Sequence, residues 1–221
     1  SSGAANFVTL HATSDVTAVT VAGDQALTVV IADTGVTSFD ASAATGVINV
    51  DSSAITLNLL TSIKGGEGTA DVLHINEAVS VTGSTSTTNT LFYASGFETV
   101  NVQDVGRAID LTTNGSGITT WDFDDDAGTT AQQVLTLNVD YDQATTAKLG
   151  AADDVVNSAN VALTLNMASD DLLAGTAITG GTGTSDEIKV ATANADDTLQ
   201  LGNTTLVEKL TTTGVAGTGS T

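Results

Sequence analysis

The sequence has no cysteine and no proline, and aromatic residues make up only 4% of it. Without cysteine the chain has no disulfide, thiolate metal ligand or thiol nucleophile, so small disulfide-stapled folds are excluded. Without proline, its turns have to be made by Gly, Asn, Asp and Thr. With so few aromatic rings, we expect a core of small aliphatic side chains in thin, repeated layers.

Basic residues are also scarce: five Lys and Arg stand against 26 Asp and Glu, which gives a formal net charge of -21. Nucleic acids and anionic membrane surfaces both attract cationic side chains, so we predict no nucleic-acid partner. No apolar run approaches the ~20 residues of a spanning helix, so we predict no membrane insertion. The excess of carboxylates favours cation binding, high-salt surroundings, or both.

The sequence shows no catalytic constellation. The two histidines, His11 and His74, are far apart, and neither has the spacing of a metalloprotease site. His74 lies inside an expected strand, where it points opposite to Leu73 and Ile75 and is expected at the surface. A lyase or hydrolase built on a β-helix would usually present basic residues on a concave face, and the chain has few of them. We therefore predict that it is not an enzyme.

Short segments rich in Val, Ile, Leu and Thr recur along the chain, and Gly, Asp, Asn or Ser usually lies between them. This pattern is typical of β-strands and predicts an all-β fold. The clearest examples are residues 16–21, 27–31, 47–50, 55–59, 72–75, 99–102, 135–139, 163–167 and 188–190.

The sequence also contains an internal duplication. Residues 25–29 match 133–137 and residues 54–59 match 162–167, both at a shift of 108. The strongest match, of residues 63–75 with 178–190, has a shift of 115, and residues 97–100 loosely match 207–210. We interpret these matches as two related β units of about 110 residues each, 1–114 and 115–221.

Two architectures fit such units. In a parallel β-helix, or β-solenoid, successive strands stack as rungs and both units form one continuous body. In tandem β-sandwich domains, each unit folds as a separate pair of sheets. The small aliphatic core and the many Gly, Asn and Asp residues favour the solenoid, whereas the repeat length suits the sandwich.

Both copies contain the motif G-G-x-G-x-x-D, followed by alternating apolar residues. The first copy has Gly65, Gly66, Gly68 and Asp71, and the second has Gly180, Gly181, Gly183 and Asp186. Glycines leave backbone carbonyl oxygens unshielded, and together with a carboxylate these are ligands that Ca²⁺ prefers. The alternative is a glycine-rich turn in which the aspartate hydrogen-bonds to its own backbone.

A second candidate metal site is the acidic cluster Asp122, Asp124, Asp125 and Asp126 beside Trp121. Close carboxylates repel one another unless a cation or water screens them. The cluster therefore predicts either a calcium site, with Asp122, Asp124 and Asp126 as ligands, or a solvated loop.

Residues 36–46, residues 60–68 and the Gly96-Phe97-Glu98-Thr99 segment resemble the repeats of Gram-negative S-layer proteins of the RTX-secreted type. The resemblance implies a β-solenoid, calcium-dependent folding, type I export and assembly into a two-dimensional lattice. The motif departs from the nonapeptide consensus G-G-x-G-x-D in two ways. Each copy has one more residue between the third glycine and the aspartate, and each stands alone.

We therefore predict a secreted structural segment of a surface layer, located outside the cell on the bacterial cell surface. Its expected cofactor is Ca²⁺, which would stabilise the fold. Its expected partners are lattice or filament neighbours of its own kind and cell-surface polysaccharide. The alternative function is an adhesin or carbohydrate-binding module made of tandem β-sandwich domains.

Overall fold

The computed structural model describes residues 6–11, 15–54, 62–76, 94–103, 108–111, 118–122, 134–137, 145–148, 155–158, 162–168, 176–181, 185–192 and 201–214. The regular elements of these ranges are all strands. In chain order they are β1 (Asn6–Leu10), β2 (Ala18–Gly23), β3 (Leu27–Ile31), β4 (Ser38–Ala44), β5 (Ile48–Asp51), β6 (Ser62–Lys64), β7 (Val72–Asn76), β8 (Ala94–Ser95), β9 (Thr99–Gln103), β10 (Ala108–Leu111), β11 (Thr120–Asp122), β12 (Val134–Leu137), β13 (Thr145–Lys148), β14 (Val155–Ser158), β15 (Leu163–Ala168), β16 (Ala177–Thr179), β17 (Glu187–Thr192), β18 (Thr204–Thr205) and β19 (Lys209–Gly214).

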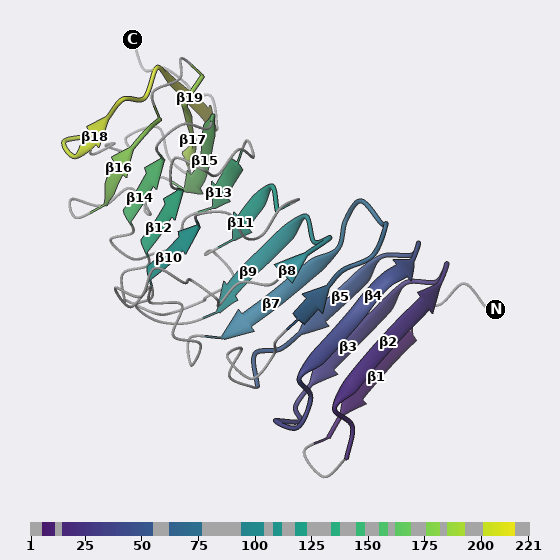
Figure 1. The fold of residues 1–221 in the computed structure, drawn as a ribbon. Coiled ribbons are helices and arrows are strands. Elements are labelled where there is room, and N and C mark those ends of the chain that lie inside the picture. The colour runs from purple at the N-terminus through teal and green to yellow at the C-terminus, as the bar shows by residue number, and fades with distance from the viewer. Residues whose placement is uncertain are drawn as a thin grey trace.

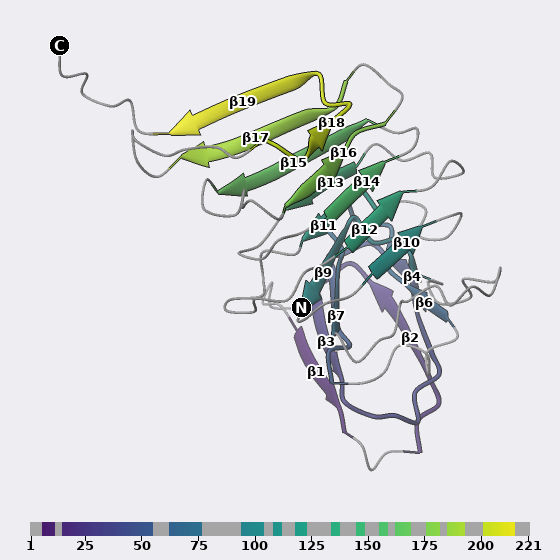
Figure 2. The same ribbon diagram turned by 90° about the vertical axis from the view of Figure 1, so that its left-hand side faces the viewer.

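The strands alternate between two walls of one solenoid. The odd-numbered strands, β1 to β19, form a ten-stranded sheet, and the even-numbered strands form a four-stranded sheet (β2 to β8) and a five-stranded sheet (β10 to β18). Neighbouring strands within these sheets pair in parallel, as in β1 with β3 and β17 with β19 (Figures 1 and 2). The predicted parallel β-solenoid is confirmed.

Tandem β-sandwich domains, the alternative architecture, are wrong for this chain. Sandwich domains are built from antiparallel strands, and each has its own pair of sheets. Here the ten-stranded sheet continues through the expected boundary between the two units, because Thr120 of β11 pairs with Thr99 of β9. On the opposite wall, β8 ends one sheet and β10 begins the next.

One inward-facing column of side chains runs the length of the ten-stranded sheet. The parallel register stacks one residue from each strand directly on the next. These residues are Val8, Val29, Val50, Leu73, Val100, Trp121, Ala147, Leu165, Ile188 and Leu210. The inner eight are 2% exposed or less, whereas the two end members, Val8 and Leu210, are 43% and 44% exposed. Each fully buried aliphatic side chain contributes about 1.5–3 kcal/mol.

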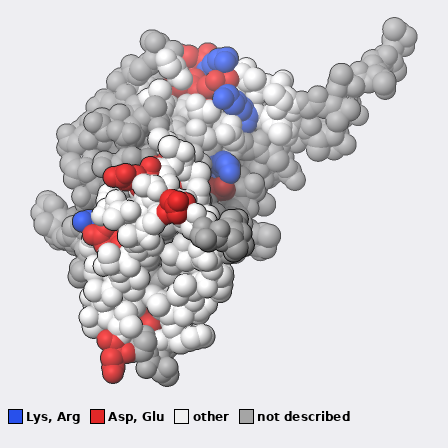
Figure 3. All heavy atoms as spheres, turned by 90° about the vertical axis from the view of Figure 1, so that its right-hand side faces the viewer, with Lys and Arg blue, Asp and Glu red and all other residues white. Residues whose placement is uncertain are grey.

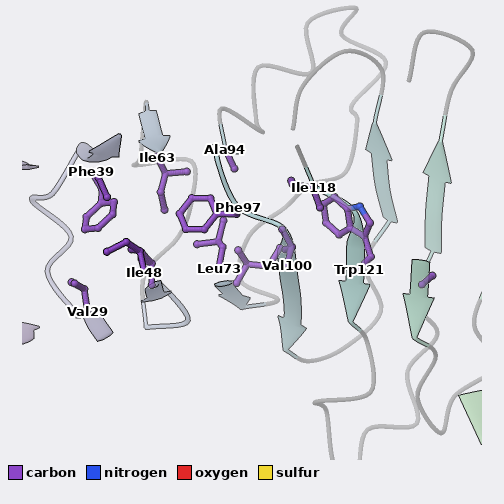
Figure 4. Packing of buried hydrophobic residues seen from close by; sticks show 14 of the residues in the cluster. Val29, Phe39, Ile48, Ile63, Leu73, Ala94, Phe97, Val100, Ile118 and Trp121 are labelled. Carbon is purple, nitrogen blue, oxygen red and sulfur yellow. The ribbon is translucent and has the colours of Figure 1, made fainter. Parts of the chain in front are cut away.

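Side chains of the opposite wall and of the corners close the core. Phe39, Ile63 and Ala94 stack in register on β4, β6 and β8 and face the column of the ten-stranded sheet (Figure 4). Trp121 is fully buried, and its register neighbour on β13 is the small Ala147. The largest side chain of the column therefore stacks on its smallest one, which suits the close packing of a protein interior.

The solenoid repeats with every turn, and the length of its turns varies. Leu27 pairs with Ile48, 21 residues further on, whereas Val72 pairs with Thr99 after 27 and Thr145 with Leu163 after 18. The sequence match of residues 25–29 with 133–137 therefore joins strands of different walls, β3 and β12. The match of residues 63–75 with 178–190 is structurally equivalent, since it joins β6 to β16 and β7 to β17.

Most of the expected strands are present with nearly the expected bounds. Residues 55–59 lie outside the described residues. In the part of the chain that the structure describes, no helix is long and apolar enough to cross a membrane.

Candidate functional site: two glycine–aspartate turns

The two G-G-x-G-x-x-D motifs form matching corners of the solenoid. We call residues 65–71 the first glycine–aspartate turn and residues 180–186 the second. The first connects β6 to β7 and the second connects β16 to β17. β7 and β17 are the fourth and ninth strands of the ten-stranded sheet. Residues 182–184, Gly183 among them, lie outside the described residues, so the two turns are compared through Gly180, Gly181 and Asp186.

In the first glycine–aspartate turn, the carboxylate of Asp71 is fully buried. It accepts backbone hydrogen bonds from two successive rungs of the solenoid. Its Oδ2 accepts the N–H of Gly66 at 2.7 Å, within the same turn. Its Oδ1 accepts the N–H of Ile48 at 2.7 Å, from the preceding turn. These short, charge-assisted bonds compensate the burial of the carboxylate.

The second turn repeats this arrangement. Asp186 is fully buried, its Oδ2 accepts the N–H of Gly181 at 2.7 Å, and its Oδ1 accepts the N–H of Leu163 at 2.7 Å. Leu163 begins β15 as Ile48 begins β5, so the two aspartates contact equivalent positions of the preceding strand. The same geometry at both places shows that the motif specifies it.

A glutamate from the following turn completes each arrangement. Glu98 Oε2 accepts the N–H of Asp71 at 2.7 Å, and Glu208 Oε2 accepts the N–H of Asp186 at 3.0 Å. In return, the carbonyl oxygens of Asp71 and Asp186 accept the N–H groups of Glu98 and Glu208, both at 3.1 Å. Each aspartate thus joins three successive turns of the solenoid.

The first glycine of each motif allows the next turn to approach closely. A Cβ on Gly65 would lie 1.9 Å from the carbonyl oxygen of Gly96, and a Cβ on Gly180 would lie 1.9 Å from that of Leu206. Gly96 and Leu206 both have positive φ, 70° and 55°. The requirement for glycine therefore comes from the packing of one turn on the next.

Calcium binding at these turns stays a prediction, and the hydrogen bonds of the two aspartate carboxylates bear on it. Calcium takes six to eight oxygen ligands at about 2.3–2.6 Å. Both oxygens of Asp71 and of Asp186 instead face backbone N–H groups, whose positive ends would oppose a cation. Among the described residues, no three His, Cys, Asp or Glu side chains are grouped as a metal site would need. The hydrogen bonds follow the alternative interpretation of the motif, a turn whose aspartate binds backbone.

The acidic cluster beside Trp121 is described only in part. Asp122 is nearly buried at the end of β11, and its carboxylate forms an ion pair with Lys148 of the adjacent strand β13. Asp124, Asp125 and Asp126 lie outside the described residues. Calcium binding by this cluster remains a prediction.

The other described lysines also contact carboxylates on the outer faces of the sheets. Lys64 Nζ lies 3.3 Å from Asp40, and Lys209 Nζ lies 2.8 Å from Glu187. Figure 3 shows lysines adjoining acidic groups on one face of the molecule. The hydroxyl and N–H of Ser42, with a smaller effect of Lys64, lower the pKa of Asp40. The ammonium of Lys209 and the hydroxyl of Thr211 lower the pKa of Glu187.

His74 lies on the outer face of β7, as predicted, since its neighbours Leu73 and Ile75 are buried. Its Nδ1 is 3.3 Å from the side-chain amide of Asn101 on β9.

Sequence reasoning missed the parts played by Glu98 and Glu208. The signal that could have revealed them is the weak match of residues 97–100 with 207–210, at nearly the offset of the two turns.

No protein-family model matches the chain, and neither a curated protein nor a solved structure matches it.

Proposed function

We propose that this chain is a structural segment of a secreted surface-layer protein that assembles with copies of itself on the bacterial cell surface. The observation that supports the proposal best is the ten-stranded parallel sheet. Its hydrogen bonds run from turn to turn and its side-chain column is continuous, which gives a stiff, extended body. Stiffness of this kind suits a scaffold whose task is to hold a fixed spacing.

The two outer strands of the ten-stranded sheet offer surfaces for assembly. β1 and β19 are the outer strands of the sheet, and such edges pair readily with a further strand. Val8 and Leu210 expose the two outer members of the core column, and Val8, Leu10, Val19 and Leu27 line a pocket of about 320 Å³. Because the surfaces at β1 and β19 differ, a contact between these two surfaces of neighbouring copies would be head-to-tail and would propagate as a filament or lattice row.

Charge gives calcium a role in this proposal. Copies that each carry a formal charge of -21 repel one another, and divalent cations between acidic surfaces reduce that repulsion. Calcium would act in this way outside the two glycine–aspartate turns, in agreement with the hydrogen bonding of Asp71 and Asp186.

Electron microscopy of the purified protein with calcium and with EGTA, at matched ionic strength, tests the proposal. We expect sheets or filaments with calcium and a shift toward single particles in EGTA. The double variant Val8→Lys with Leu210→Lys should stay as single particles. Thr69→Lys, a control at the exposed corner before the fourth strand of the sheet, should assemble as the unchanged protein does. Single particles of the unchanged protein in both conditions would refute self-assembly.

A polysaccharide-binding function is the second candidate, and the outer face of the ten-stranded sheet supports it. Thr99, Thr120, Thr146 and Thr164 stack in one register column on this face, one strand apart. Strands lie about 4.8 Å apart, so the column presents hydroxyl groups at a regular spacing that suits a repeating polymer. Retention on immobilised bacterial surface polysaccharide, lost in Thr120→Val with Thr146→Val, would favour it. Equal retention of both proteins would count against it.

A further inference from the structure

We infer that the two glycine–aspartate turns are clamps between successive turns of the solenoid and that they hold without a metal ion. The resemblance to calcium-binding repeats implies that such glycines and aspartates form a cation site. The hydrogen bonds of Asp71 and Asp186 assign them a different role, the joining of three neighbouring strands through backbone groups.

The first support is that the carboxylates take the place of a missing backbone partner. Ile48 and Leu163 are the first residues of β5 and β15, where a strand begins and its leading N–H points toward the next turn. A buried N–H without an acceptor would cost about 1–3 kcal/mol. Asp71 and Asp186 supply that acceptor, each at 2.7 Å.

The second support is the extra residue in the motif. The calcium-binding consensus places one residue between the third glycine and the aspartate, whereas this chain places two, Thr69 and Ala70 in the first turn. In the structure, Asp71 immediately precedes β7, and both its oxygens reach N–H groups on the inner side of the corner. The exposed residues of the corner are Glu67, Thr69 and Ala70.

The third support is the reciprocal bond to the following turn. Glu98 accepts the N–H of Asp71 while its own N–H is donated to the carbonyl oxygen of Asp71, and Glu208 does the same with Asp186. A glutamate that ligated a cation with the aspartate would turn its oxygens toward the aspartate carboxylate. Here it caps the backbone of the aspartate instead.

The decisive experiment compares Asp71→Asn with the unchanged protein by denaturant unfolding, once with excess calcium and once with EGTA. An asparagine has one oxygen and one NH₂ group, so Ile48 or Gly66 loses its acceptor. We expect the unfolding equilibrium constant to rise at least tenfold, and by the same factor in both media. Asp186→Asn should behave in the same way. Glu67→Gln, which removes an exposed acid of the same corner, should change it by about twofold or less.

If Asp71 ligates calcium, its replacement matters only when calcium is bound, so a loss confined to the calcium medium would overturn the inference.

A measurement on the unchanged protein covers the case in which Asp71→Asn does not fold. Hydrogen exchange of the Ile48, Gly66, Leu163 and Gly181 amides should be equally slow with calcium and with EGTA. Exchange that accelerates tenfold or more at these amides in EGTA would overturn the inference. The result is separable from the proposed function, since assembly depends on the ends and surfaces of the body and the clamps lie inside it.

Discussion

Replacement of Gly65 by alanine tests whether glycine is needed for the contact between successive turns. The added Cβ would lie 1.9 Å from the carbonyl oxygen of Gly96 and 2.6 Å from its carbonyl carbon. Both are backbone atoms, so the clash cannot be relieved by rotation of a side chain. The two turns would have to separate, which weakens the bond from Gly65 N–H to the carbonyl oxygen of Ser95, now 2.8 Å long.

The expected loss follows from opposing contributions. Overpacking costs about 1–3 kcal/mol, and a weakened backbone hydrogen bond costs about 1 kcal/mol. The lower entropy of alanine in the unfolded chain offsets about 0.4–1 kcal/mol. We therefore expect a net loss of about 2 kcal/mol, which in a domain of this size lowers Tm by about 4–8 °C.

Thermal unfolding followed by circular dichroism measures this shift, and Gly202→Ala is the matched control. Nothing lies within 4 Å of a Cβ built on Gly202, so its Tm should stay the same or rise slightly. A Gly65→Ala protein as stable as the Gly202→Ala protein would refute the packing argument.

Three further predictions concern Leu206, Trp121 and Glu187. Leu206 has φ 55° at the position that Gly96 occupies beside the first glycine–aspartate turn, and Leu206 is 58% exposed. Leu206→Gly should therefore raise the free energy of unfolding by about 0.5–1 kcal/mol, measured by denaturant unfolding. A loss of stability would contradict the equivalence of the two positions. The ring of Trp121 is fully buried against Ile118 and Val100 (Figure 4). Trp121→Ala should therefore cost about 3–5 kcal/mol in the same assay, and Trp121→Phe clearly less. Equal losses in the two variants would disprove that the buried ring stabilises the fold by packing. Glu187 has a lowered pKa, so the stability that its carboxylate contributes is present at neutral pH and is lost as the pH falls through that lowered pKa. In Lys209→Met, NMR titration of the carboxyl group should show a higher pKa for Glu187. An unchanged titration would exclude Lys209 as the cause.

Much of the fold could be predicted from the sequence because it depends on alternation. The segments at 27–31 and 72–75 alternate inward and outward residues, and they form β3 and β7 almost as expected. β4 could not be predicted in this way, because Asp40 and the alanines of Ser38–Ala44 have low strand propensity and are held by pairing with β2 and β6.

The repeat of the chain with each turn of the solenoid is not visible in the sequence, because the corners differ in length. Turns of 18 to 31 residues blur any short repeat, so only the longer duplication that contains both glycine–aspartate turns can be seen in the sequence. In a chain rich in Val, Leu and Thr, β3 also looked like β12, although the two lie on opposite walls. The motif residues could be located from the sequence, but the direction of a carboxylate, toward a cation or toward a backbone N–H, depends on the turn stacked beside it.

The positions of the two glycine–aspartate turns along the sheet give them unequal effects on cooperativity. Asp71 sits at the fourth of ten strands, whereas Asp186 binds the ninth strand to the last one through Glu208. In a solenoid each repeat is stabilised by the repeats next to it, so weak contacts at one interface uncouple the unfolding of the strands on its two sides. Opening the contacts of Asp71 would divide the sheet into two separately melting blocks, and opening those of Asp186 with Glu208 would release β19 alone from the described strands.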